Sequence, residues 1–332
     1  MHSFLVVPLL LTQLAAATMT LSAAAAASIA LAGCESKCGA VDVPYPFGTT
    51  DGCHRPGFKV TCNRALQPPK LFLGSDTDGP EVLAISIRNS TVRVRGAVWP
   101  FAAVATTTTT SSATIDVVPA NLRPYPYVLS AARNSIAVVG CGFTTRILSF
   151  SHQACPGAKQ RKLRHGRPCD GAGCCEVPVV PPTGLTSFTV RFAWLPENAT
   201  ARPAWVRPGA SVLAVEREWW RDRDHVVPVK LSLLSTGNAS GSELAIPAVL
   251  DWTLSNSSCA MAPRRSGSGS GCISKNSECV DSVSSAYGYV CQCSDGYDGN
   301  PYVPSGCKGS GTHIPPGKFN PITLYGNGRI SA

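Results

Sequence analysis

The stretch CGAVDVPYPFGTTDGCHRPGFKVTC, residues 38–62, decides the fold that the sequence predicts. Pro44 and Pro46 flank Tyr45. Each proline fixes its own φ and keeps its predecessor out of the helical region, so this segment is predicted to be extended. Residues 58–61 alternate in polarity as a half-buried strand does, and glycines supply the turns between these pieces. Its three cysteines favour a small cross-linked β element, and no part of it indicates catalysis.

The N-terminal segment predicts export from the cell. Residues 1–32 contain no Lys, Arg, Asp or Glu, and an apolar run is followed by Ala-Leu-Ala before Gly33, which is typical of a signal peptide. A transmembrane anchor is the alternative, because about 20 apolar residues span a bilayer. A bacterial lipobox also matches residues 31–34, but the uncharged start of the chain disfavours it. Four N-x-S/T sequons agree with the secretory route; they are Asn89, Asn198, Asn238 and Asn256.

Charge and cysteine content restrict the classes of partner. All fifteen cysteines follow residue 33, which favours structural disulfides in an oxidising compartment. The formal net charge is +9; residues 33–105 carry eight Lys or Arg against six Asp or Glu, and residues 106–258 carry fifteen against ten. A positive protein outside the cell meets mainly acidic polysaccharide and membrane surfaces. Nucleic acid is excluded as a partner by the compartment.

The opening stretch resembles the galacturonan-binding module of plant wall-associated receptor kinases. The matching positions are Cys38-Gly39, residues 44–48, Gly52-Cys53, Gly57-Phe58 and Thr61-Cys62. Residues 68–74 and 82–95 fit the same module as further strands. The resemblance implies a module over residues 33–105 that binds pectin, and a mainly β, disulfide-rich fold for the whole chain.

Residues 106–258 are predicted to form a second β-rich lobe. Residues 97–120, which include five consecutive threonines, are interpreted as a flexible or O-glycosylated linker. Strands are expected over residues 135–141, 185–192 and 246–254, and residues 211–234 read as a strand, a charged segment and a further strand. Two adjacent tryptophans in that charged segment are interpreted as core anchors, with a sugar-stacking surface as the alternative; they are Trp219 and Trp220.

Residues 259–307 resemble an epidermal-growth-factor-like module, with the motif GYDGNPY at residues 296–302 and a C-x-C pair. A unit this small is held by disulfides rather than by a core. The resemblance implies the pairs Cys259–Cys279, Cys272–Cys291 and Cys293–Cys307. Residues 256–258, Asn-Ser-Ser, stand where calcium-binding versions carry acidic ligands, so no calcium site is predicted. Zinc is excluded because the C-x₂-C spacing is absent, and no cofactor is expected.

Residues 308–332 are predicted to be a flexible tail with no apolar run that could span a membrane. The chain thus resembles a receptor ectodomain without its transmembrane helix or kinase. It is either a soluble form, secreted to the cell wall, or a truncated gene model of a membrane-associated receptor.

Nine cysteines remain outside the growth-factor-like module, so one thiol is predicted to be free or to pair with another chain. Family members carry a partner a few residues from the position of Cys155 that is missing here, so Cys155 is the candidate. The nine are Cys34, Cys38, Cys53, Cys62, Cys141, Cys155, Cys169, Cys174 and Cys175.

Two groups of cations are candidates for contact with acidic polysaccharide, because guanidinium and ammonium groups bind carboxylates. The first group is Arg55, Lys59, Arg64 and Lys70; the second is Lys159, Arg161, Lys162, Arg164 and Arg167. The second group also reads simply as a solvated loop. Catalysis is not expected, because no histidine lies in a triad or a metal-binding motif. The alternative function is a secreted cysteine-rich module or decoy that binds proteins, including other receptor ectodomains.

Overall fold

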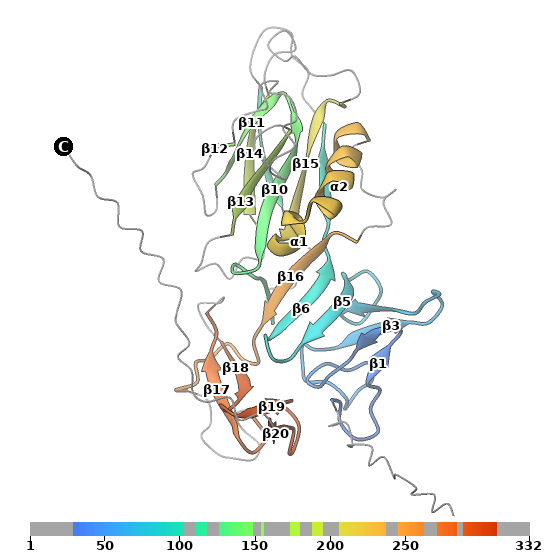
Figure 1. Cartoon of the computed structure of the whole chain (residues 1–332), viewed down its shortest axis with the longest axis vertical. Helices are drawn as coiled ribbons and strands as arrows, with labels where there is room; N and C mark the ends of the chain where they lie inside the picture. The colour runs from blue at the N-terminus through green and yellow to red at the C-terminus, as the bar shows by residue number, and fades with distance from the viewer. Residues whose placement is uncertain are drawn as a thin grey trace, which may run out of the picture.

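The computed structural model describes residues 29–102, 111–117, 126–148, 154–155, 173–179, 188–194, 206–236, 245–261, 271–283 and 288–310. Within these ranges there are twenty strands and two helices. The prediction of a mainly β, disulfide-rich chain is confirmed. Figure 1 shows three parts: a sandwich, a six-stranded sheet below it and a small unit beside the end of that sheet.

The six-stranded sheet is antiparallel throughout. Its order is β3 (Val60–Asn63), β4 (Lys70–Leu73), β5 (Glu81–Ser86), β6 (Thr91–Arg95), β16 (Pro247–Trp252) and β9 (Tyr127–Leu129). A small ribbon of β1 (Lys37–Cys38) and β2 (Val41–Asp42) accompanies it. The ribbon is cross-linked by the disulfides Cys34–Cys53 and Cys38–Cys62, the second of which ties it directly to β3.

The strands of this sheet follow the alternation of the sequence. Val92 and Val94 of β6 are fully buried, whereas Arg93 and Arg95 between and beside them are half-exposed. Successive side chains of a strand point to opposite faces, so this pattern places one apolar and one polar face on the sheet.

The segment after Pro44 places an aromatic residue in the core. Phe47 packs edge-on against Phe58 at 5.1 Å and against Trp252 at 5.7 Å between ring centroids, and all three side chains are buried. Gly48 allows the chain to turn there, because a Cβ at this position would lie 2.2 Å from the carbonyl oxygen of Cys53. The opening stretch therefore supplies an aromatic side chain to the core beneath the sheet.

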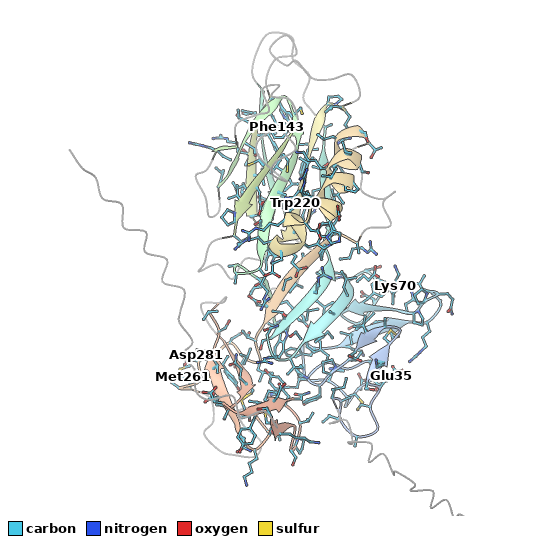
Figure 2. The ribbon with its side chains drawn as sticks, in the orientation of Figure 1. Glu35, Lys70, Phe143, Trp220, Met261 and Asp281 are labelled. Carbon is cyan, nitrogen blue, oxygen red and sulfur yellow. A yellow bond between two sulfur atoms is a disulfide. The ribbon has the colours of Figure 1, made fainter. Side chains whose placement is uncertain are left out.

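The sandwich consists of two four-stranded antiparallel sheets. One has the order β13 (Cys174–Pro178), β10 (Asn134–Cys141), β15 (Gly209–Glu216) and β7 (Val98–Phe101). The other has the order β12 (Ala154–Cys155), β11 (Phe143–Ile147), β14 (Phe188–Trp194) and β8 (Ser111–Val117). Aromatic contacts join the two sheets, such as Trp99 with Phe188 and Phe101 with Phe192. Figure 2 marks Phe143 in this core.

Strand pairing crosses the predicted boundary between residues 105 and 106 in both directions. β9 and β16, from the predicted second lobe, complete the six-stranded sheet, while β7 from the first module joins the sandwich. The prediction of a linker over residues 97–120 is wrong for the segments that form β7 and β8, because β7 pairs with β15 and β8 pairs with β14. Residues 106–110, the threonine run, lie outside the described residues.

The strand predicted over residues 226–234 is wrong, because this segment is helical. α1 (Arg217–Arg221) is followed by α2 (Arg223–Ser235), whose first turn is capped by the Asp222 carboxylate accepting from the Asp224 N–H. The buried residues of α2 recur at helical spacing; they are Val226, Val229, Lys230, Leu233 and Leu234. Both helices cover the face of the β13–β10–β15–β7 sheet that lies away from its partner sheet (Figure 1).

The two adjacent tryptophans have different environments. Trp220 is fully buried between the helices and the sheet, which confirms its interpretation as a core anchor (Figure 2). Trp219 is half-buried and stacks on His225, with ring centroids 4.9 Å apart and planes 4° from parallel.

Residues 259–310, named here the six-cysteine unit, carry three disulfides. They are Cys259–Cys279, Cys272–Cys291 and Cys293–Cys307, which confirms the predicted pairing. Two hairpins make up the unit: β17 (Ser277–Asp281) with β18 (Tyr289–Cys293), and β19 (Tyr297–Gly299) with β20 (Cys307–Gly309). Across the described parts of the chain, neither helix has the length and apolar character needed to cross a membrane.

Candidate functional site

The first group of predicted cations lies mostly around the β3–β4 hairpin. Lys59 directly precedes β3, and Lys70 begins β4 opposite Asn63. Val60 and Leu71, their strand neighbours, are fully buried. Because side chains alternate along a strand, Lys59 and Lys70 belong to the face of the sheet opposite its core. β3 is an edge strand, so this face continues into solvent at the sheet's free edge.

Two further cations on the same face were missed by sequence reasoning. Arg93 and Arg95 alternate with the buried valines of β6 and are 38% and 39% exposed. The pattern TVRVR in residues 91–95 is the signal that could have identified them, since alternation on a half-buried strand places both arginines outward. The four outward cations are named here the basic face: Lys59, Lys70, Arg93 and Arg95.

Each cation of the basic face already has a carboxylate partner. Lys59 Nζ lies 3.2 Å from Asp51 Oδ1, and Lys70 Nζ lies 3.2 Å from Glu81 Oε1. Arg95 Nε donates to the same Glu81, whose Oε2 is 2.7 Å away. These carboxylates lower the local positive charge. The face is therefore a network of ion pairs in which the cations outnumber the carboxylates.

Arg93 and Arg64 have partners from more distant parts of the chain. Arg93 Nε donates to Glu216 Oε2 at 2.6 Å, which connects the sheet to the end of β15 in the sandwich. Arg64, at the free edge beyond β3, is 62% exposed and forms an ion pair with Glu35. Figure 2 labels Glu35 and also Lys70 of the basic face.

Arg55 lies apart from the basic face. It is half-buried, and a Cβ added to Gly271 would lie 2.9 Å from its Nη1, so the guanidinium borders the six-cysteine unit. Among the described residues it has no carboxylate partner within ion-pair distance. The guanidinium of Arg55 therefore lies at the border with the six-cysteine unit and not on the basic face.

Other predicted sites fall partly or wholly outside the described residues. The second group of cations lies there entirely: Lys159, Arg161, Lys162, Arg164 and Arg167. Of the sequons, Asn89 and Asn256 are exposed, while Asn198 and Asn238 lie outside. The side chain of Cys155 is also outside, so its predicted free thiol stays a prediction. Cys174 and Cys175 are both disulfide-bonded.

The network shifts the acidity of two carboxyl groups. Burial acts to raise the pKa of Glu81, but hydrogen bonds from Arg95 and Lys70, together with their charges, outweigh it and hold the pKa below its ordinary value of 4.5. The hydrogen bond and charge of Lys59, with a smaller contribution from His54, lower the pKa of Asp51.

The shift at Glu81 predicts a pH-dependent contribution to stability. A carboxyl group with a depressed pKa stabilises the fold above its unfolded pKa, and this contribution is lost as the pH falls through the folded value. We expect Glu81→Gln to lower the free energy of unfolding by about 1 kcal/mol at neutral pH, since these pairs are partly exposed. The difference from the parent protein should shrink below pH 4.5.

Urea unfolding at neutral pH and near pH 3 measures this difference, with Asp78→Asn as the control. Asp78 is exposed and has no ion-pair partner among the described residues, so its variant should match the parent at both pH values. A Glu81→Gln deficit that persists unchanged in acid would contradict the assignment to charge.

The two motifs that carry the family resemblance touch each other. Asn300 of the GYDGNPY motif donates through Nδ2 to the carbonyl oxygens of Tyr45, at 2.7 Å, and Ile29, at 3.0 Å. Tyr302 of the same motif packs against Trp252, with ring centroids 5.5 Å apart. The six-cysteine unit is therefore docked on the six-stranded sheet and its opening segment.

Comparison with known proteins agrees with this geometry. Residues 34–95 match the family model described as wall-associated receptor kinase galacturonan-binding. This chain is similar to wall-associated receptor kinases. Wall-associated receptor kinase 2 of Arabidopsis thaliana is 28% identical over 283 residues, and wall-associated receptor kinase 1 is 27% identical over 286 residues. The resemblance seen in the sequence motifs is thus confirmed.

The matches to these relatives extend well beyond residues 34–95. Each covers 83% of the chain but 34% of the relative, so the chain spans about a third of the length of the curated relatives that it matches. No solved structure matches. All four cations of the basic face lie within residues 34–95, which the family model covers.

Proposed function

We propose that this chain binds homogalacturonan-type pectin outside the cell through its basic face and Arg64. The observation that carries the proposal is the coincidence of two features. The family model described as galacturonan-binding matches residues 34–95, and the same residues form a sheet face that carries half-exposed lysines and arginines.

The chemistry of binding is an exchange of carboxylate partners. A polygalacturonate carries a carboxylate on each sugar, and the cations of this face already hold protein carboxylates. Asp51 is 92% exposed and Glu35 is 36% exposed, so their ion pairs with Lys59 and Arg64 are surface pairs. Such pairs contribute about 0–1 kcal/mol each, and a ligand carboxylate can replace or share them at little cost.

The arrangement favours a polymer over a single sugar. Lys70 of β4 and Arg95 of β6 contact the same Glu81, so they lie close together on the basic face. Lys59 directly precedes β3, the strand next to β4. One extended chain that crosses these strands can therefore contact several cations at once, and weak contacts add because the later ones are intramolecular. Arg93, held by Glu216 close to the sandwich, marks the inner limit of the face.

A protein-binding role without carbohydrate affinity is the alternative function. Met261, 74% exposed, and Val283, 86% exposed, are apolar residues of the six-cysteine unit that favour it. The two functions differ in their response to ligand charge. A protein that binds carboxylates prefers de-esterified to methyl-esterified pectin, and its binding weakens as the salt concentration rises. Binding through an apolar protein contact shows neither response.

The test is a pull-down of the full chain on de-esterified polygalacturonate. Changing Lys59, Arg64 and Lys70 together to glutamine should weaken binding about tenfold, because three exposed pairs of about 0.5 kcal/mol each are removed. Parent binding should fall as salt rises from about 0.1 M to 1 M, since the screening length shrinks from about 10 Å to 3 Å.

A charge-matched control separates this face from the overall net charge. Arg133, Arg221 and Arg223 are exposed cations of the sandwich and its helices, and their joint change to glutamine removes the same three charges. The control variant should bind as the parent does. Equal loss in both triple variants would assign binding to net charge, and binding that is indifferent to salt would refute the ionic mechanism.

A further inference from the structure

A cleft of about 620 Å³ separates the six-cysteine unit from the β5–β6 hairpin. Residues 87–89 of the turn between β5 and β6 form one wall, and residues 291–299 with Pro301 and Ser310 form the other. Figure 1 shows β18 and β19 beside the lower end of β5 and β6. The volume lies within the range of small-ligand sites.

One wall of this cleft contains a sequon. Asn89 begins the sequence Asn-Ser-Thr, is exposed and lines the cleft. The turn that holds it is tight, because the Ser90 N–H donates to the Ile87 carbonyl at 3.1 Å and Ser90 has a φ of 52°. A sugar attached to Asn89 therefore starts at the cleft, with little freedom in the backbone that carries it.

The charges of the cleft disfavour an acidic ligand. Arg88 is the cation of its lining, whereas Asp295 and Asp298 contribute two carboxylates. The site therefore has a small negative balance and repels a uronate, in contrast to the basic face. A neutral sugar meets no such repulsion.

The remaining lining suits a neutral sugar. Tyr297 is 40% exposed and offers part of its ring to the cleft, and aromatic rings stack well on the apolar face of a sugar. Gln292, exposed, and Ser294 supply polar side chains for hydroxyl and acetamido groups.

We propose that the cleft holds the innermost N-acetylglucosamine residues of an N-glycan attached to Asn89. In the attachment step the Asn89 amide nitrogen loses a proton and bonds to the anomeric carbon of the oligosaccharide, while the lipid pyrophosphate that carried it leaves. The tether keeps the sugar at a high effective concentration, so contacts too weak for a free sugar suffice. The glycan then bridges the hairpin and the six-cysteine unit.

The first experiment measures protection of the glycan. The full chain is made in a eukaryotic secretory host that adds uniform high-mannose glycans. Native protein is treated with an endoglycosidase that cuts between the two innermost N-acetylglucosamines, and glycopeptides are quantified by mass spectrometry. Asn89 should release its glycan at least about tenfold more slowly than Asn256, which is exposed and outside the cleft. After reduction and denaturation the two rates should be equal.

Variants then test the cleft itself. Tyr297→Ala should raise the release rate at Asn89 towards that at Asn256, whereas Met261→Ala, an exposed change outside the cleft, should leave it unchanged. Asn89→Gln should lower the melting temperature more than Asn256→Gln does. If Asn89→Gln fails to fold, the glycan is instead removed enzymatically from the folded protein, and the melting temperature is compared before and after removal. Thr91→Ser, which keeps the sequon, is then the variant used to probe this turn. An unglycosylated Asn89, equal release rates in native protein, or protection unaffected by Tyr297→Ala would each overturn the proposal.

Discussion

Replacing Trp252 by alanine is expected to lower the free energy of unfolding by about 3–5 kcal/mol, the range for removing a fully buried large aromatic side chain. Trp252 ends β16 and is 1% exposed. Its ring contacts Phe58 at 5.4 Å and Phe47 at 5.7 Å on the side of the sheet, and Tyr302 at 5.5 Å on the side of the six-cysteine unit. The deletion therefore opens a cavity where two units meet.

Chemical denaturation followed by fluorescence measures this loss, and two variants control it. Trp252→Phe keeps most of the ring and removes an indole N–H that has no acceptor among the described residues, so it should cost less than half as much. Trp219→Ala removes a half-buried ring on α1 and should cost less than about 2 kcal/mol. Equal losses for Trp252→Ala and Trp219→Ala would contradict a central role for Trp252.

Replacing Asn300 by alanine is expected to weaken the docking of the six-cysteine unit by about 2–4 kcal/mol, because buried polar groups are left unsatisfied. The side chain is 5% exposed and makes three hydrogen bonds. Its Nδ2 donates to Tyr45 and Ile29, and its Oδ1 accepts from the Tyr302 N–H at 2.9 Å. The bond to Tyr45 joins separate units, so its loss acts on the contact between them, whereas Ile29 lies within the predicted signal peptide.

Amide hydrogen exchange distinguishes this effect from global unfolding. In Asn300→Ala, exchange should accelerate in residues 297–307 and around Tyr45, while β10 and β15 of the sandwich keep their protection. Lys308→Ala changes an exposed residue of the same unit and should leave the pattern unchanged. Uniform acceleration through the whole chain would show instead that Asn300 supports the fold as one cooperative unit.

The sequence predicts a strand well where buried and exposed residues alternate one by one along it. In β6, Val92 and Val94 alternate with polar residues, so the pattern alone identifies a half-buried strand. α2 misleads because its valines are β-branched and therefore favour a strand, and because Pro228 disfavours the interior of a helix. The spacing of Val226, Val229 and Leu233 fits a helix, but a short apolar run does not distinguish the two periods clearly.

The candidate site is only partly predictable for a different reason. Lys59 and Lys70 were identified from local sequence, and the structure adds their partners Asp51 and Glu81. Glu216, which holds Arg93, follows it by 123 residues, and no local pattern predicts an ion pair over that distance. The separation of Arg55 from the basic face has the same origin, because it depends on where the six-cysteine unit docks.

The position of β16 in the six-stranded sheet has a consequence for synthesis. Val92 of β6 pairs with Leu250 of β16, so the inner edge of β6 receives its partner only after the sandwich has been made. Pairing of such high contact order is slow, since the loop between the partners must close first. Until then β6 presents open backbone donors and acceptors to other chains. Residues 34–95, which a sequence comparison delimits as one module, therefore do not form a closed folding unit, and the nascent chain depends on its own later residues to avoid edge-to-edge association.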